Sequence, residues 1–232
     1  GGYDGRGQVF VAKAAEAKSA WEDLAAEAVV AERALAIEAE ISVLVARRPN
    51  GDVVVYEPAL NHHEERVLAW SVLPGPIDAR VKREAVDIAR SITTRIDAVG
   101  LLVIEMFVVD GAKVLVNELA PRPHNSFHAT EVACATSQFE QLVRAVCDLP
   151  LGSAEVVRPV AIANLLGDVF LGDEPPAFDK ALELPGVRLH LYGKRSARPG
   201  RKMGHLSAAG SSPEEAVRLV QEAFDRIARK SG

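Results

Sequence analysis

Two glutamates lie within or beside apolar segments, where a carboxylate needs a partner to offset the cost of burial. Glu105 interrupts the apolar run LLVIEMFVV, and Glu118 follows in KVLVNELA. A lone ionised carboxylate is costly to bury in such a run. Asp110-Gly111 lies between the two runs and is one of the strongest short signals for a β-hairpin. The sequence therefore predicts two neighbouring strands that each carry one glutamate.

The register of this hairpin decides how the glutamates meet. A two-residue turn pairs Glu105 with Val116 and leaves Glu118 diagonally across on the same face. A four-residue turn places the two glutamates directly opposite. Either way the carboxylates share a face and repel each other unless a cation lies between them. Mg²⁺ suits such a site because it binds one or two carboxylates together with phosphate oxygens. The alternative, in which each glutamate pairs with its own Arg or Lys, stays open.

Three further segments could bind an anion. The loop PRPHNS at 121–126 offers a cation, an imidazole, an amide and a hydroxyl, which suit a small anionic or polyhydroxyl substrate. Basic residues gather in YGK at 192–194 and RPGRK at 198–202, and Lys and Arg make charge-assisted contacts to phosphate. The opening GGYDGRGQ could turn backbone amides toward a phosphate, although it lacks the Lys-Ser/Thr of a P-loop. By pattern alone, a solvated loop, turn or surface is the more common explanation of each segment.

The elements that must position these groups mix strands and helices. A first strand at 8–12 is followed by a helix at 13–26. The runs EISVLVARR and DVVVYE form a hairpin across Asn50-Gly51, and apolar spacing predicts a helix at 78–97. A further helix is expected at 131–150. Ser212, Pro213 and Glu215 have the spacing of a helix start. The fold class is α+β, with antiparallel hairpins and helices, and a composition shift near 152–158 suggests a boundary.

Composition narrows the class of protein. The 232 residues are 48% hydrophobic with a net charge of -5, which argues against a general nucleic-acid binder. No apolar run approaches the roughly 20 residues that span a bilayer. Cys134 and Cys147 lie in a helix-like stretch and are expected to be thiols, which favours a cytoplasmic protein. From the charge and the short apolar runs, no nucleic-acid or membrane partner is expected.

The order of these motifs resembles the N5-carboxyaminoimidazole ribonucleotide synthase family of the ATP-grasp superfamily. The resemblance rests on GGYDGRGQ, EISVLVAR, NELAPRPHNS, SQFEQLVRAV, NLLG and RPGRKMGH, and it covers essentially the whole chain. It implies an ATP-grasp region at 1–152, followed by a small C-terminal α/β domain at 153–232. It also implies carboxylation of 5-aminoimidazole ribonucleotide by bicarbonate, with ATP and Mg²⁺, in purine biosynthesis. ATP would activate bicarbonate as carboxyphosphate, and a homodimer is expected.

The resemblance also assigns residues, each at its position in this chain. It implies magnesium binding by Glu105 and Glu118, in agreement with the hairpin. For ATP it implies Gly2, Gly5, Gln8, Glu32, Arg33, Leu35 and Glu40. For the substrate it implies Tyr3, Asp4, Arg6, Ser126 and Lys202. The implied catalytic residues are Arg122, His124, Asn125, Lys194 and Arg201. Asn61 and His63 are expected to support the site rather than take part in chemistry.

Three features depart from the family. Phe127 replaces the usual glycine after HNS, and a ring there could narrow the site or reshape the loop. The tyrosine-proline step before Asn61 has become Tyr56-Glu57-Pro58. Family members also carry an N-terminal domain and a lysine-bearing strand ahead of the glycine loop, so we expect this chain to be part of a longer protein.

Two alternatives to this function remain. One is another ATP-grasp ligase, such as a formate-dependent ribonucleotide transformylase or a biotin carboxylase. Ala120 stands where the biotin carboxylase pattern has Asn, and the HNS loop and RPGRKMGH favour the aminoimidazole enzyme. The other is an inactive nucleotide-binding or dimerisation fragment.

Overall fold

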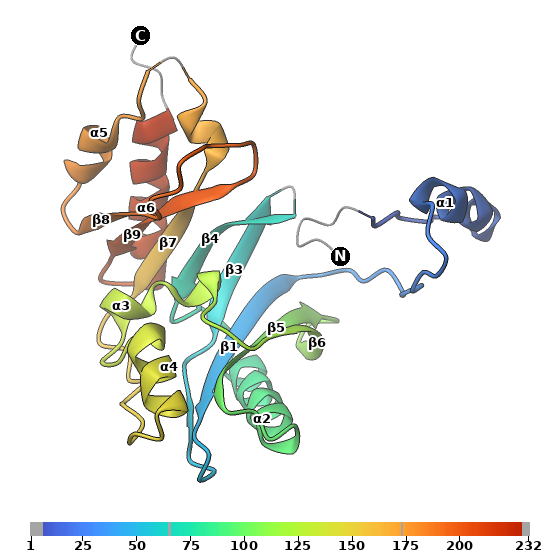
Figure 1. Cartoon of the computed structure of the whole chain (residues 1–232), viewed down its shortest axis with the longest axis horizontal. Helices are drawn as coiled ribbons and strands as arrows, with labels where there is room; N and C mark the ends of the chain where they lie inside the picture. The colour runs from blue at the N-terminus through green and yellow to red at the C-terminus, as the bar shows by residue number, and fades with distance from the viewer. Residues whose placement is uncertain (1–6, 65, 173, 229–232) are drawn as a thin grey trace.

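A computed structural model of the chain describes residues 7–64, 66–172 and 174–228 (Figure 1). Within these residues the strands form one antiparallel sheet in the order β6-β5-β1-β3-β4-β7-β9-β8, with β2 paired to β1. The strands are β1 (Ala39–Arg47), β2 (Val53–Val55), β3 (Ala59–Glu64), β4 (Val67–Leu73), β5 (Gly100–Val109), β6 (Lys113–Ala120), β7 (Val160–Leu166), β8 (Val187–Leu191) and β9 (Lys202–Ala209). The α-helices are α1 (Ala17–Leu24), α2 (Ala79–Arg95), α3 (Thr130–Ala133), α4 (Gln138–Val146), α5 (Phe178–Leu182) and α6 (Pro213–Ala228), and the 3-10 turns are η1 (Ala14–Glu16), η2 (Asn125–Phe127) and η3 (Gly167–Phe170).

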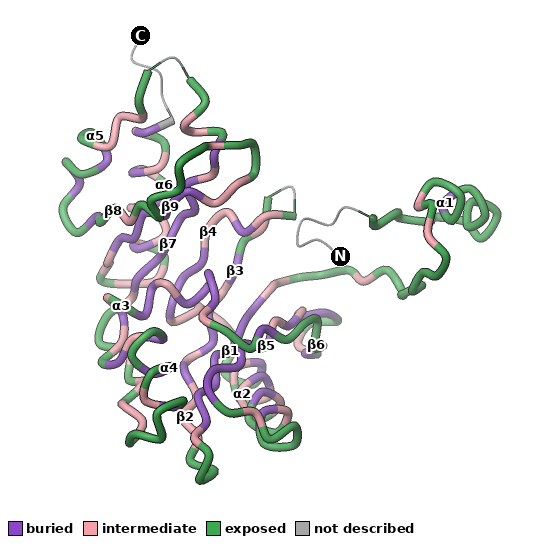
Figure 2. The backbone as a smooth tube through the Cα atoms, in the orientation of Figure 1, coloured by how far each residue is buried: buried purple, intermediate pink, exposed green. Residues whose placement is uncertain are grey.

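The first described residues form an arm that leads away from the sheet. Figure 2 shows this arm, with α1 at its far end, as almost wholly exposed. The helix expected at 13–26 is confirmed as η1 followed by α1. The strand expected at 8–12 is wrong, because this segment lies beside no described strand that could complete its backbone hydrogen bonds.

Strand β1 is buried on both faces, which explains its nearly continuous apolar sequence. Ile41, Val43 and Val45 pack with α2 in one core cluster, while Leu44 and Ala46 join a second cluster on the other face. The predicted hairpin with β2 is confirmed, with Ala46 opposite Val54. Helix α2 also forms as predicted, and Asp78 caps it by accepting hydrogen bonds from the amides of residues 80 and 81.

The β5–β6 hairpin has neither of the two expected registers at its turn. Val109 pairs with Lys113 across a three-residue loop, in which Asp110 and Gly111 have positive φ angles. A β-bulge then shifts the register, so that Glu105 lies directly opposite Glu118. An inserted residue of this kind re-aims side chains along the strand. The carboxylates therefore face each other as in the longer-turn alternative, but by a different route.

The single helix expected at 131–150 is wrong. The chain forms α3, leaves the helical path at Cys134, and starts again at α4. Ala135 N donates to Glu155 O, and Val157 N donates to Ala133 O, so backbone pairing replaces the helical hydrogen bonds. Ser137 then caps α4 by accepting from Glu140 N at 3.2 Å.

The C-terminal strands continue the same sheet, since β4 pairs with β7 and β9 joins β7 to β8. Helix α6 covers β7 and β9, and Ser212 caps it by accepting from Glu215 N, as expected. The α+β class with antiparallel strands and helices is confirmed. The division into residues 1–152 and 153–232 stays a prediction. None of the described helices has the length and apolar character needed to cross a bilayer.

Candidate active site

A cleft of about 810 Å³ is lined by residues from both ends of the sheet, β5 and β6 at one end and the β8–β9 region at the other. Its walls come from β1, β3, β5 and β6, from the loop before α3, and from the strand end and loop around β9. The lining residues include Gln8, Ile37, Glu40, Asn61, His63, Leu68, Glu105, Phe107, Asn117, Glu118, Arg122, His124, Asn125, Ser126, His128, Tyr192, Lys194, Gly200 and Lys202. Most of the predicted site residues that the structure describes are thus brought together in one place.

The two glutamates form a paired acidic site on the cleft wall. Directly opposed residues of an antiparallel pair have Cβ atoms about 4.5–5.5 Å apart. Glu105 is half-buried and Glu118 is exposed to the cleft. This donor set fits a magnesium ion, because opposed carboxylates open to a polar cleft can share one cation and leave its other positions to water or phosphate.

His124 is the nearest partner of this acidic pair. Its Nε2 lies 3.0 Å from Oε1 of Glu105, and its Nδ1 lies 2.9 Å from Oγ of Ser126. Burial alone would raise the pKa of Glu105. The hydrogen bond from His124 opposes the effect of burial, and together with nearby His63 and Lys202 it holds the pKa of Glu105 below its usual value.

Asn125 gives the clearest sign that the cleft binds a ligand. Its side chain is only 9% exposed, yet neither Oδ1 nor Nδ2 has a hydrogen-bond partner among the described residues. Buried amides are normally paired, so an amide left unpaired at a cleft wall is suited to a ligand that supplies both a donor and an acceptor. Arg122, in the same loop, donates from one guanidinium nitrogen to Pro123 O at 3.0 Å and lines the cleft.

Two lysines from β9 and the loop before it line another part of the cleft. Lys194 and Lys202 both face the cleft, and Lys194 Nζ donates to the backbone oxygen of Lys202. Burial is the main cause that lowers the pKa of Lys202; Arg122 and Lys194 lower it further, and Glu105 opposes them. Arg201 is placed differently, because its guanidinium donates to Ser196 O and Oγ and does not line the cleft.

The residues expected at the nucleotide are only partly gathered. Gln8 and Glu40 line the cleft, and Glu40 Oε2 lies 2.9 Å from His63 Nδ1. Glu32 and Arg33 are exposed on the arm and Leu35 is half-buried, all outside the cleft wall. Gly2, Tyr3, Asp4, Gly5 and Arg6 lie outside the described residues.

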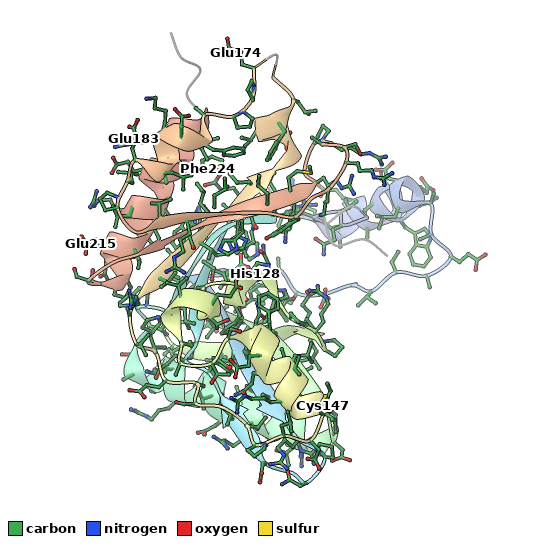
Figure 3. The ribbon with its side chains drawn as sticks, turned by 60° about the vertical axis from the view of Figure 1, so that its left-hand side comes forward. His128, Cys147, Glu174, Glu183, Glu215 and Phe224 are labelled. Carbon is green, nitrogen blue, oxygen red and sulfur yellow. The ribbon has the colours of Figure 1, made fainter. Side chains whose placement is uncertain are left out.

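Sequence reasoning missed a column of stacked histidines beside the cleft. The His128 ring stacks on His205 at 4.9 Å, and His205 stacks on His190 at 4.5 Å with planes 5° apart. Figure 3 shows His128 at the middle of the molecule, between the strands β8 and β9 and the short helix α3. Burial is the main cause that lowers the pKa of His128 to about 4 and of His205 to about 3. The three histidines are far apart in sequence, and no local pattern reveals the stack.

This column is poorly arranged for a metal. Glu131, His190 and His205 each offer an atom within 4.8 Å of the others. The lone pair of an imidazole nitrogen lies in the ring plane, so two nearly parallel stacked rings do not direct their lone pairs at one ion.

Phe127 does not narrow the cleft, contrary to one possibility raised by the sequence. Its side chain is fully buried in the core beside Leu73, Ala129 and Ala133, and it meets the Tyr56 ring edge-on at 6.3 Å. The ring points into the apolar interior and leaves Asn125 and Ser126 at the cleft. The phenylalanine that replaces the usual glycine therefore anchors the loop 121–126 in the core and does not enter the cleft.

Comparison with known proteins agrees with this geometry. Residues 1–139 match the family model of the ATP-grasp domain, and residues 161–218 match that of the phosphoribosylaminoimidazole carboxylase C-terminal domain. The chain is 38% identical over 233 residues to the N5-carboxyaminoimidazole ribonucleotide synthase of Bacillus subtilis, covering 100% of this chain and 59% of that protein. It is 41% identical over 228 residues to the Vibrio cholerae enzyme of the same name, covering 95% and 58%. The chain therefore spans less than two thirds of these relatives.

Solved structures show the same similarity. An ADP complex of an N5-carboxyaminoimidazole ribonucleotide synthetase superposes with a TM-score of 0.85 at 36% identity, covering 99% of this chain and 60% of the other. The Aspergillus clavatus synthase in complex with ADP and 5-aminoimidazole ribonucleotide superposes with a TM-score of 0.81 at 30% identity, covering 90% and 57%. The match to the ATP-grasp domain model covers more than half of the chain and is consistent with the antiparallel sheet and the cleft. This chain belongs to the ATP-grasp family.

Proposed function

We propose that the chain carries out the ATP-dependent carboxylation of 5-aminoimidazole ribonucleotide with bicarbonate, in de novo purine biosynthesis. One observation supports it most: a single cleft combines an opposed carboxylate pair, an unpartnered buried amide and two lysines. These are the groups that a reaction between a nucleoside triphosphate, a small anion and a phosphorylated amine requires. Relatives of the same name, including one solved with ADP and 5-aminoimidazole ribonucleotide, point to the same substrates.

The chemistry proceeds in two steps. An oxygen of bicarbonate attacks the γ-phosphorus of ATP, ADP leaves, and carboxyphosphate forms. The amine nitrogen of the ribonucleotide then bonds to the carboxyl carbon as the bond to phosphate breaks, and the nitrogen loses one proton. Magnesium held by Glu105 and Glu118 would neutralise the phosphate charges during the first step.

The remaining cleft residues bind and orient. Lys202 and Arg122 place positive charge beside the acidic pair, where the phosphoryl group and bicarbonate must meet. The Asn125 amide supplies one donor and one acceptor to the substrate. Lys194 suits the ribonucleotide phosphate because a lysine binds phosphate as a compact charge.

The test is ADP release by the protein in its longest natural form, with Mg²⁺ and bicarbonate, in the presence and absence of 5-aminoimidazole ribonucleotide. We expect strong stimulation by the ribonucleotide. A flat response in a folded, ATP-binding protein would overturn this substrate and favour another ATP-grasp ligase.

The use of Mg²⁺ and bicarbonate and the roles of the individual site residues stay predictions. So do the roles of the glycine-rich opening and of residues 32–35 at the nucleotide, the part played by Arg201, the two-part organisation, and a cytoplasmic homodimer. Chemical crosslinking of the purified protein at micromolar concentration tests the dimer directly.

A further inference from the structure

Ser42 is a hydroxyl in the middle of the apolar strand β1. It is fully buried, and in the sheet it pairs with Glu105 of β5 on one side and with Ala59 of β3 on the other. Burying a hydroxyl without hydrogen-bond partners costs free energy, so a buried serine is normally paired. The partners of Ser42 therefore indicate its role.

Both partners of Ser42 belong to a buried polar network. Its Oγ donates to Ser126 Oγ at 3.0 Å and accepts from Asn61 Nδ2 at 2.6 Å. Asn61 Oδ1 in turn accepts from Ser71 Oγ at 2.9 Å. All four side chains are at least nine-tenths buried, which shields these hydrogen bonds from water.

The network ends on the imidazole of His124. Ser126 Oγ lies 2.9 Å from Nδ1, and the backbone N–H of Ser126 also points at Nδ1 from 3.4 Å. Because a backbone amide can only donate, Nδ1 is the acceptor, and the hydrogen-bond pattern assigns the ring proton to Nε2. That N–H then donates to Glu105 Oε1 at 3.0 Å.

The direction of the hydrogen bonds is consistent along the whole path. With Asn61 donating to Ser42, the hydroxyl hydrogen of Ser42 is directed to Ser126, and that of Ser126 to His124. The donor to Ser42 is the side-chain amide of Asn61, which does not exchange its proton in catalysis. The path is therefore suited to fixing a tautomer rather than to conducting protons.

We propose that Ser42 is a positioning residue, which acts through Ser126 to hold His124 as the Nε2–H tautomer facing Glu105. The proposal rests on the proposed function, in which Glu105 and His124 form part of the reaction centre. Because hydrogen bonds at both nitrogens fix the His124 ring, the ring in turn fixes the Glu105 carboxylate on the side of the hairpin that it shares with Glu118. Ser42 itself does not line the cleft.

The experiment compares Ser42→Ala with Ser42→Thr, which keeps the hydroxyl, and with Ser207→Ala. Ser207 is a matched control because it is also a buried strand serine, yet its Oγ has no partner among the described residues. For Ser42→Ala we expect kcat of ribonucleotide-dependent ADP release to fall about 10–100-fold, as is usual for a residue behind a reaction centre. KM for the ribonucleotide should stay unchanged, Ser42→Thr should recover most of kcat, and Ser207→Ala should match the unaltered protein.

A second measurement does not depend on enzymatic activity. Nitrogen-15 NMR of the histidine rings in the unliganded protein at neutral pH should show His124 with Nδ1 unprotonated and Nε2 protonated, and Ser42→Ala should make the other tautomer detectable. An Nδ1–H tautomer in the unaltered protein, or unchanged kcat and tautomer in Ser42→Ala, would overturn the proposal. Absence of ribonucleotide-stimulated ADP release would instead count against the proposed function, while the NMR result would still decide the role of Ser42.

Discussion

Phe127→Ala tests whether the cleft loop is anchored in the core. The Phe127 ring is fully buried in a core cluster, and the alanines of that cluster, such as Ala129 and Ala133, cannot reach across the space that its loss would leave. A phenylalanine buries on the order of 150–250 Å². At about 25 cal/mol per Å² this corresponds to roughly 4–6 kcal/mol for the whole residue. Alanine retains its Cβ, so we expect the free energy of unfolding to fall by about 3–5 kcal/mol.

Urea unfolding at neutral pH measures this loss as a shift of the midpoint at constant slope. Phe10→Ala is the control, because Phe10 is 74% exposed on the arm and its removal should change the free energy of unfolding by less than about 0.5 kcal/mol. Asn125 and Ser126 belong to the same 3-10 turn as Phe127, so a loosened turn should also reduce ribonucleotide-dependent ADP release. A Phe127→Ala variant that unfolds within 1 kcal/mol of Phe10→Ala would refute the anchoring.

Three further outcomes follow from the site. Glu118→Gln should abolish ATP turnover in a protein that still folds, since it removes one of two opposed carboxylates; retained turnover with the same magnesium dependence would count against the metal site. Asn125→Ala should leave the urea midpoint nearly unchanged, because the amide has no partner to lose, yet raise KM for the ribonucleotide at least about tenfold; an unchanged KM would exclude substrate contact. Burial lowers the pKa of His128 from 6.5 to about 4 and that of His205 from 6.5 to about 3. At a pH between 6.5 and the lowered pKa of each ring, the unfolded chain therefore binds more protons than the native chain. Stability should therefore fall as pH drops below 6.5, by up to about 1.4 kcal/mol per pH unit for each histidine, and urea titrations at pH 7, 5.5 and 4.5 would show no such loss if the rings were already charged.

Local signals were sufficient for much of the fold and for recognising the two glutamates as a candidate pair. Asn50-Gly51 and Asp110-Gly111 mark two real hairpins. The two-residue period of a strand places Glu105 and Glu118 on one face for a two- or four-residue turn, whereas the observed three-residue loop does so only together with the β-bulge. Ser212 and Glu215 mark the start of α6 through capping, which depends only on neighbours in sequence.

What sequence could not give depends on contacts between distant segments. The β-bulge that brings the glutamates opposite each other is a property of the paired strands. The break after α3 arises because residues 133–135 pair with residues 155–157. The same holds for Ser42, whose role becomes visible only when Ser126 and Asn61 meet it from other elements.

Transfer of oxygen from bicarbonate to phosphate tests the central claim most directly. The protein in its longest natural form would be given ¹⁸O-labelled bicarbonate, ATP, Mg²⁺ and 5-aminoimidazole ribonucleotide, and the phosphate formed would be analysed by mass spectrometry. If bicarbonate attacks the γ-phosphorus, each phosphate carries one oxygen from bicarbonate, and we expect one ¹⁸O per phosphate in step with ribonucleotide consumption. Phosphate that carries oxygen only from water would contradict the account.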